Sequence, residues 1–217
     1  GRDILSRVIY GGRQSIVLAA IATSMSMALG CIIGMIAGYF GSWVDVAITS
    51  ISNIFQGLPG MTMMIAIAGL MGSGVTSMML ALVITSWVGF SRIVRGEVMK
   101  IKKEYFIEGL RSFGVGHMRI LFYHVMPNLI SSIVIIFATR IASSILSVAS
   151  LSFLGLGLEP PTPDWGVMIS DARMYYRTSP MLVIAPGVCI VLFSLCVNII
   201  ADWLRDRLDV RRDSVKE

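Results

Sequence analysis

A few polar side chains that interrupt long apolar stretches are the first candidates for chemistry in this sequence. Arg140 lies deep in one apolar stretch, and Asn53 and Gln56 lie in another, close to Pro59. A charge in the hydrocarbon of a bilayer costs about 2.5–3.5 kcal/mol on insertion scales, so Arg140 should face a bundle interior or water. Proline breaks helical hydrogen bonding, and polar groups beside such a break tend to line a cavity. These three residues are therefore candidates for a translocation path. The alternative is a structural role, in hydrogen bonds between helices for Asn53 and Gln56 and with carbonyl groups or an acid for Arg140.

Other chemistries have little support in the sequence. The two histidines, His117 and His124, stand seven residues apart with no cysteine near them, which is a poor pattern for a metal site. No serine stands in a nucleophile-elbow motif, and no Gly-Lys-Ser/Thr follows the glycines at 72–74 to make a phosphate-binding loop. We therefore expect no catalytic residue, no metal site and no cofactor bound by this chain. Energy for active transport would have to come from a partner or an ion gradient.

The elements that position these residues are predicted to be membrane-spanning helices. Of the 217 residues, 55% are hydrophobic and 14% are charged, and the mean hydropathy is +0.79. Soluble domains average about 25% charged residues. Apolar segments long enough to cross a bilayer, about 20 residues each, cover residues 15–40, 44–71, 75–94, 128–154 and 181–203. The sequence thus predicts an all-α membrane protein with five spans and one transmembrane domain over residues 1–217.

The longest polar interruption between these spans begins at residue 104. As a helix, residues 104–113 would carry an apolar face and a charged face. The apolar face holds Phe106, Leu110 and Phe113, and the charged face holds Glu104, Glu108 and Arg111. Gly114 and Gly116 should end this helix because glycine accepts the backbone angles that stop one, and Pro127 stands where the next span could begin. A short amphipathic helix between two spans is suited to docking on a soluble partner.

Positive charges orient the bundle. Twelve of the 18 Lys and Arg residues lie between residues 92 and 119 or after residue 203, and five lie on the opposite side of the bundle. The positive-inside rule places the twelve in the cytoplasm. The segment 96–127 is then cytoplasmic, and the proline-rich loop 155–180 is external. No interleaving of basic and aromatic residues suggests a nucleic-acid partner.

Three local patterns complete the picture. Residues 1–14 mix charged and apolar side chains, which predicts a short helix in the membrane interface. Gly30, Gly34 and Gly38 stand four apart, which predicts a smooth stripe for close helix packing. In the external loop, Asp164 is predicted to cap a short helix.

The cytoplasmic segment resembles the signature of permease subunits of ATP-binding-cassette (ABC) importers. That signature reads Glu-Ala-Ala, three residues, Gly, nine residues, Ile-x-Leu-Pro. The matching positions here are Glu108, Gly109 and Leu110, then Gly114, and finally His124, Met126 and Pro127. The spacing is retained, although Gly109, Leu110, His124 and Met126 differ from the consensus residues. Two more stretches, GRDILSR at 1–7 and LSFLGLGLEPPTPDWG at 151–166, resemble the dipeptide, oligopeptide and nickel branch of this family.

The resemblance implies a fold and a set of partners. The fold would be the type I importer bundle, and relatives carry a further span before the GRD motif, which we expect to be missing from this sequence. ATP and Mg²⁺ would bind to separate cytoplasmic ATPase subunits, so this chain would not be an enzyme. A second homologous permease and an external or periplasmic solute-binding protein would complete the assembly in a bacterial or archaeal inner membrane. The coupling residues would be Glu104, Phe106, Glu108, Gly109, Leu110, Arg111, Phe113 and Gly114.

The solute is left open by the sequence. Import of di- or oligopeptides is the first expectation, with nickel or a metal chelate as the alternative within the same branch. A further alternative is a membrane scaffold whose cytoplasmic helix recruits a partner without a substrate path. Asn53, Gln56 and Arg140 facing one cavity would favour the importer, whereas their burial in helix contacts would favour the scaffold.

Overall fold

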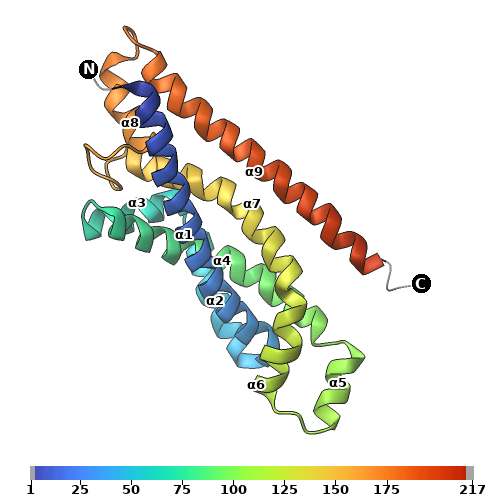
Figure 1. Ribbon diagram of the computed structural model, residues 1–217. Helices are drawn as coiled ribbons and strands as arrows, with labels where there is room; N and C mark the ends of the chain where they lie inside the picture. The colour runs from blue at the N-terminus through green and yellow to red at the C-terminus, as the bar shows by residue number, and fades with distance from the viewer. Residues whose placement is uncertain (1–2, 214–217) are drawn as a thin grey trace.

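The computed structural model describes residues 3–213, and within them the chain is entirely helical apart from turns and loops (Figure 1). The long helices are α1 (Ile4–Phe40), α4 (Val75–Ile101), α7 (Met126–Phe153) and α9 (Met181–Asp213). The shorter ones are α2 (Ser42–Gly57), α3 (Gly60–Met71), α5 (Tyr105–Ser112), α6 (His117–Ile120), the π-helical turn η1 (Leu121–Val125), α8 (Trp165–Ala172) and the 3-10 turn η2 (Arg173–Tyr175). The all-α prediction is confirmed.

The described residues contain four helices long and apolar enough to cross a membrane, or five if the α2–α3 pair forms one span. The predicted span 44–71 is this pair, and its two helices meet at an angle of 90°. Leu58, between them, has an extended backbone with φ −100° and ψ 141°. The residue before a proline is pushed out of the helical region by the proline ring, so Pro59 breaks the segment as its sequence predicts.

The close-packing stripe on α1 faces α4. A Cβ atom built on Gly30 would lie 2.5 Å from the Cβ of Phe90, and one built on Gly34 would lie 2.5 Å from the carbonyl oxygen of Ser91. These distances leave no room for a side chain, so the glycines let the two helices approach closely. α4 is the central helix, and 56% of its most apolar 18-residue stretch is buried. α9 runs along the outside, where 11% of the corresponding stretch is buried (Figure 1).

The first residues differ from the sequence prediction. Residues 4–14 are the opening turns of α1 and do not form a separate interfacial helix. Asp3 caps α1 by accepting a hydrogen bond from the Ser6 amide at 2.9 Å. Gly11 and Gly12 are buried against Asp164 and Trp165 at the start of α8. Val8, Gly11 and Gly12 thus lie against the start of α8, whereas Leu5 and Ile9 remain exposed.

Pro127 stands in the first turn of α7, as predicted, but the chain before it is already helical. His117–Phe153 runs as one 37-residue apolar helix in which η1 precedes Pro127 without a break. A proline lacks an N–H, and its ring crowds the carbonyl group one turn earlier. The wider π-helical turn gives room at that point, and the Asn128 side-chain amide donates to the His124 carbonyl at 2.6 Å.

Candidate functional site

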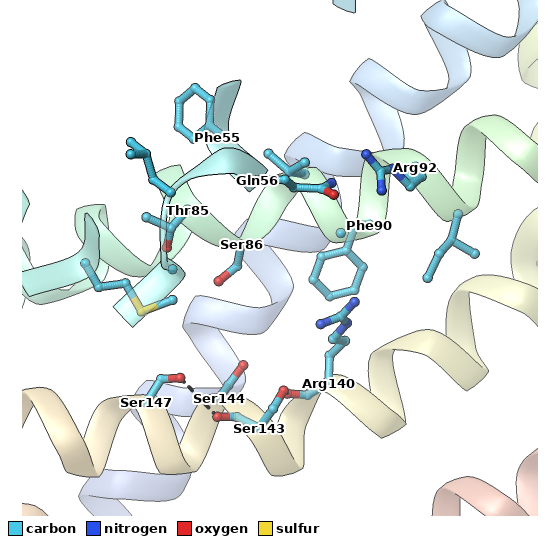
Figure 2. A pocket seen from close by; sticks show the side chains of 16 residues that line it. Phe55, Gln56, Thr85, Ser86, Phe90, Arg92, Arg140, Ser143, Ser144 and Ser147 are labelled. Atoms are coloured by element: carbon cyan, nitrogen blue, oxygen red, sulfur yellow. Dashed lines mark hydrogen bonds between the residues drawn. The ribbon is translucent and has the colours of Figure 1, made fainter. Parts of the chain in front are cut away.

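A cavity of about 540 Å³ lies between α2, α3, α4 and α7 (Figure 2). Its polar lining consists of Gln56, Thr85, Ser86, Arg92, Arg140, Ser143, Ser144 and Ser147. Phe55, Leu58, Met64, Val88, Phe90 and Ile93 supply the larger apolar side chains. The lining thus comes from the broken pair α2–α3 on one side and from two long helices on the others.

Arg140 reaches into this cavity from α7. Figure 2 shows its side chain directed toward Phe90 of α4, and its guanidinium carbon lies 5.9 Å from the centroid of that ring. A Cβ atom at Gly89 would lie 2.8 Å from a guanidinium nitrogen of Arg140, so glycine at 89 makes room for this charge. The arrangement places a cation over an aromatic face, beside the other polar side chains of the cavity.

The other two candidates from the α2 segment lie differently. Gln56 lines the cavity itself. Asn53 does not, and instead its side-chain oxygen accepts a hydrogen bond from the Arg92 guanidinium at 3.3 Å. Arg92 does line the cavity. The structure therefore brings Gln56 and Arg140 together with Arg92, and Asn53 acts on the cavity through Arg92.

Several lining residues escape the sequence analysis. Ser143, Ser144 and Ser147 follow Arg140 at the spacing of one helix face, a signal that the sequence does contain. The Ser143 and Ser147 hydroxyls donate to carbonyl groups of their own helix, at 2.8 Å and 3.1 Å. The Thr23 hydroxyl donates to the Ser144 oxygen at 2.7 Å, which ties α1 to this face. Arg92 is missed because, near a run of basic residues, it is read as part of the charged end of its span.

The chemistry of this lining is cationic and hydrogen-bonding. The described residues around the cavity include two guanidinium groups and no Asp, Glu, His or Cys. Arginine guanidinium groups bind carboxylates in a fork geometry, and hydroxyl groups accept or donate as needed. The cavity is therefore suited to a polar solute that carries carboxylate groups.

The helix α5 lies at the end of the molecule far from α8 (Figure 1). It spans eight residues, close to the predicted 104–113, and Gly114 ends it with φ +73°, as its sequence predicts. Gly116 has an ordinary φ of −63° and precedes α6. The predicted helix and its glycine stop are thus present.

The structure divides the predicted apolar face of α5 between the outer and the inner side of the helix. Ile107 is fully buried, and Leu110 packs beside it in a cluster with α1, α4 and α7 residues. Phe106 is 47% exposed and Phe113 is 89% exposed. Because Ile107 and Leu110 are one turn apart, they form the inward face, and the two phenylalanines remain outside.

The predicted charged face is divided in the same way. Glu104 and Glu108 are exposed, and Glu104 stands at the N-terminal end of α5 without a side-chain cap. Arg111 instead turns inward, with its guanidinium carbon 5.4 Å from the centroid of the Tyr39 ring. We call the exposed side of α5 and its following turn the coupling surface, which consists of Tyr105, Phe106, Glu108 and Phe113.

The loop 155–180 lies at the opposite end of the bundle and contains α8 (Figure 1). Asp164 precedes α8, but its side chain makes no cap bond, contrary to the sequence prediction. It is fully buried and accepts a hydrogen bond from the Ser15 hydroxyl of α1. The Trp165 indole donates to the Val8 carbonyl at 2.9 Å, so α8 is fastened to the start of α1.

The helical fold, with α5 at one end of the bundle and α8 at the other, agrees with a match to a known protein family. Residues 30–211 match the family described as the binding-protein-dependent transport system inner membrane component, and the chain belongs to this family. It is a permease subunit of an ABC importer, an inner membrane component with several membrane-spanning helices.

Individual relatives narrow the comparison. The chain is 40% identical over 214 residues to the glutathione transport system permease protein GsiD of Pectobacterium atrosepticum. This alignment covers 99% of this chain and 71% of that protein. It is 42% identical over 209 residues to GsiD of Escherichia coli O6:K15:H31, in an alignment that covers 96% of this chain and 69% of that protein.

Solved structures support the fold. The MetNI methionine ABC transporter in an inward-facing conformation superposes with a TM-score of 0.77 at 14% identity, covering 96% of this chain and 99% of that one. An amino acid ABC transporter with histidines gives a TM-score of 0.70 at 19% identity, covering 95% and 99%. The type I importer bundle expected from the sequence is confirmed.

Proposed function

We propose that this permease imports small peptides and that the cavity between α2, α3, α4 and α7 lies on the solute path. The observation that carries the proposal is the placement of Arg140 and Arg92 on one cavity with no carboxylate among its described lining residues. A small peptide carries at least one carboxylate, and glutathione, the solute named for the relatives GsiD, carries two. Guanidinium groups bind carboxylates through paired, charge-assisted hydrogen bonds.

The alternatives fit this cavity less well. A bare nickel ion would meet two positive charges and none of the His, Cys, Asp or Glu ligands that it needs among the described lining residues. A negatively charged chelate would be compatible with the same charges. A scaffold without a path gives no reason for Gln56 and Arg140, from helices far apart in sequence, to share one polar cavity.

We assign different partners to the two ends of the bundle. We place the coupling surface on a cytoplasmic ATPase subunit that binds ATP and Mg²⁺, with Glu104, Glu108, Gly109 and Gly114 shaping the contact and Leu110 anchoring α5 to the bundle. Closure of the ATPase would shift the bundle between two states, which needs only a difference in ATPase affinity between them. A second permease would complete the path, and a solute-binding protein would dock near the loop 155–180.

Uptake by the reconstituted importer tests the solute path. In proteoliposomes with all subunits, Arg140→Leu should lower ATP-driven uptake of labelled glutathione or dipeptide roughly 10- to 100-fold, the range expected for losing a charged hydrogen-bond donor. Arg140→Lys should retain part of the uptake because it keeps the charge. Arg13→Leu is the matched control, because Arg13 is an exposed residue of α1 outside the cavity. Unchanged uptake by Arg140→Leu at equal protein levels would remove Arg140 from the path.

A further inference from the structure

A second cavity, of about 410 Å³, lies at the end of the bundle that carries α5. Gly38 near the end of α1, Gly41 in the turn that follows, and Asp45 of α2 line it. The lining also includes Lys102 and Lys103, just after α4, and Arg111 of α5. Four segments therefore meet around a space that the solute path does not include.

The one acidic side chain of this described lining is already neutralised. The Arg95 guanidinium donates two hydrogen bonds to the Asp45 carboxylate, one of them at 2.5 Å to Oδ2. Among the described residues, Lys102, Lys103 and Arg111 form no salt bridge. The cavity thus has three cationic groups that form no ion pair within the described part of the chain.

Two of these cations crowd one aromatic ring. The Lys102 ammonium lies 5.9 Å and the Arg111 guanidinium carbon 5.4 Å from the centroid of the Tyr39 ring. Burial, and after it the charge of Arg111, lower the pKa of Lys102, with a smaller opposing effect from Asp45. The Nε atom of Arg111 is buried and has no acceptor in the described structure. An anion in the cavity would relieve both the repulsion and the missing hydrogen bond.

The position of the cavity, beside the ends of two candidate membrane spans, indicates where such an anion would come from. Two candidate spans end beside it, α1 at Phe40 and α4 at Ile101. Trp43, in the first turn of α2, is 77% exposed, and exposed tryptophans gather at the level of lipid headgroups. Basic pockets between helices at this level bind phosphate headgroups.

We propose that this cavity binds a phosphate group, supplied in the membrane by the headgroup of an anionic phospholipid. Arg111 belongs to α5, so the bound phosphate connects α5 to the ends of α1 and α4. Its location is distinct from the coupling surface, because Arg111 turns toward Tyr39 while Phe106 and Phe113 point outward. A carboxylate of the ATPase is the competing occupant, and it would have to reach past the exposed side of α5.

Lipid retention by the assembled importer tests the proposal. The complex in detergent is titrated with phosphatidylglycerol, with phosphatidylcholine of the same acyl chains, and with inorganic phosphate, and bound species are counted by native mass spectrometry. The variant Lys102→Gln/Arg111→Gln should bind phosphatidylglycerol roughly 30-fold more weakly, at about fivefold per basic residue. The matched control Lys100→Gln/Arg119→Gln removes the same charge from exposed positions nearby and should bind like the wild type.

Each result decides the proposal. Selective loss of phosphatidylglycerol in the first variant supports it, and competition by inorganic phosphate at similar concentration supports the phosphate site while assigning it to free phosphate. Equal binding of the two lipids, or equal loss in both double variants, overturns it. Loss of the ATPase with lipid binding intact overturns it in favour of the protein partner. If the double variant does not assemble, Lys103→Glu with Lys100→Glu as control makes the same comparison at exposed positions.

Discussion

The two short helices α5 and α8 have the same length and opposite relations to the bundle. Each spans eight residues. In α8, Trp165, Gly166, Val167, Met168 and Ala172 are buried, whereas Ile107 is the buried residue of α5. α8 is also joined to α1 by the hydrogen bonds of Asp164 and Trp165, and α5 has no comparable bond to the spans among the described residues.

This difference indicates which helix needs a partner. The apolar residues of α8 are covered by α1, α7 and α9 within this chain. The exposed aromatic side chains of α5 and its following turn are not covered, and Tyr105 and Phe113 are 90% and 89% exposed. Large apolar side chains gathered on a small exposed surface mark an interaction site more often than chance. The helix α8 is thus packed within this chain, whereas α5 presents aromatic side chains that this chain does not cover.

The largest difference in stability between the two helices is expected when one glycine in each is replaced by alanine. A Cβ atom at Gly166 would lie 2.2 Å from the Ala149 carbonyl oxygen, and one at Gly109 would meet nothing within 4 Å. Gly166→Ala should therefore destabilise the permease by about 1–3 kcal/mol or more, the range for overpacking. Gly109→Ala should be neutral or stabilise it by up to ~1 kcal/mol through helix propensity.

The melting temperature of the purified permease in detergent measures the stability of both glycine variants. If Gly166→Ala melts at the wild-type temperature, α8 is not packed against α7 as described. If Gly109→Ala is the more harmful of the two for stability, the inner side of α5 is more crowded than the structure shows.

An effect of similar or smaller size is expected at the buried carboxyl group beside α8. One oxygen of Asp164 accepts the Ser15 bond and the other has no partner in the described structure. Asp164→Leu should cost about 1–3 kcal/mol because the Ser15 hydroxyl loses its acceptor in a buried site. Asp164→Asn should cost less, since its side-chain oxygen can still accept from Ser15. Thermal unfolding checks the pair, and equal losses in the two variants would contradict a role for this hydrogen bond.

Much of the fold is predictable because local patterns determine it. The apolar lengths predict the spans, Pro59 predicts the break between α2 and α3, and Gly114 predicts the end of α5. Gly30 and its partners in the stripe predict a close helix contact without saying which helix makes it. In each case one short stretch carries the physical cause.

The remaining features depend on residues far apart in sequence. Asp164 looks like a helix cap until α1 brings Ser15, 149 residues away, to its carboxyl group. The rotation of α5 is not fixed by two helical turns in which Phe106 and Ile107 are both apolar, and packing against α1 and α7 decides it. Arg92 and Arg140 meet in one cavity because α4 and α7 lie side by side, which neither span predicts alone.

The smallest effect on stability, and the most selective on function, is expected at the coupling surface. Phe106→Ser/Phe113→Ser should leave the unfolding free energy of the permease alone within about 0.5 kcal/mol, as for other exposed sites. Its affinity for the ATPase subunit should fall roughly 30-fold or more, because exposed aromatic residues that fill a partner's pocket dominate binding. Pull-down of the ATPase at graded concentrations measures the affinity.

Tyr123→Ser is the matched control, since Tyr123 is an aromatic residue of η1 that is 74% exposed and lies outside the coupling surface. It should change neither stability nor ATPase binding. If the double variant binds the ATPase like the wild type, the exposure of α5 has another cause and the partner docks elsewhere. If the double variant instead unfolds the isolated permease, the two phenylalanines are packed within the chain, and the contrast between α5 and α8 disappears.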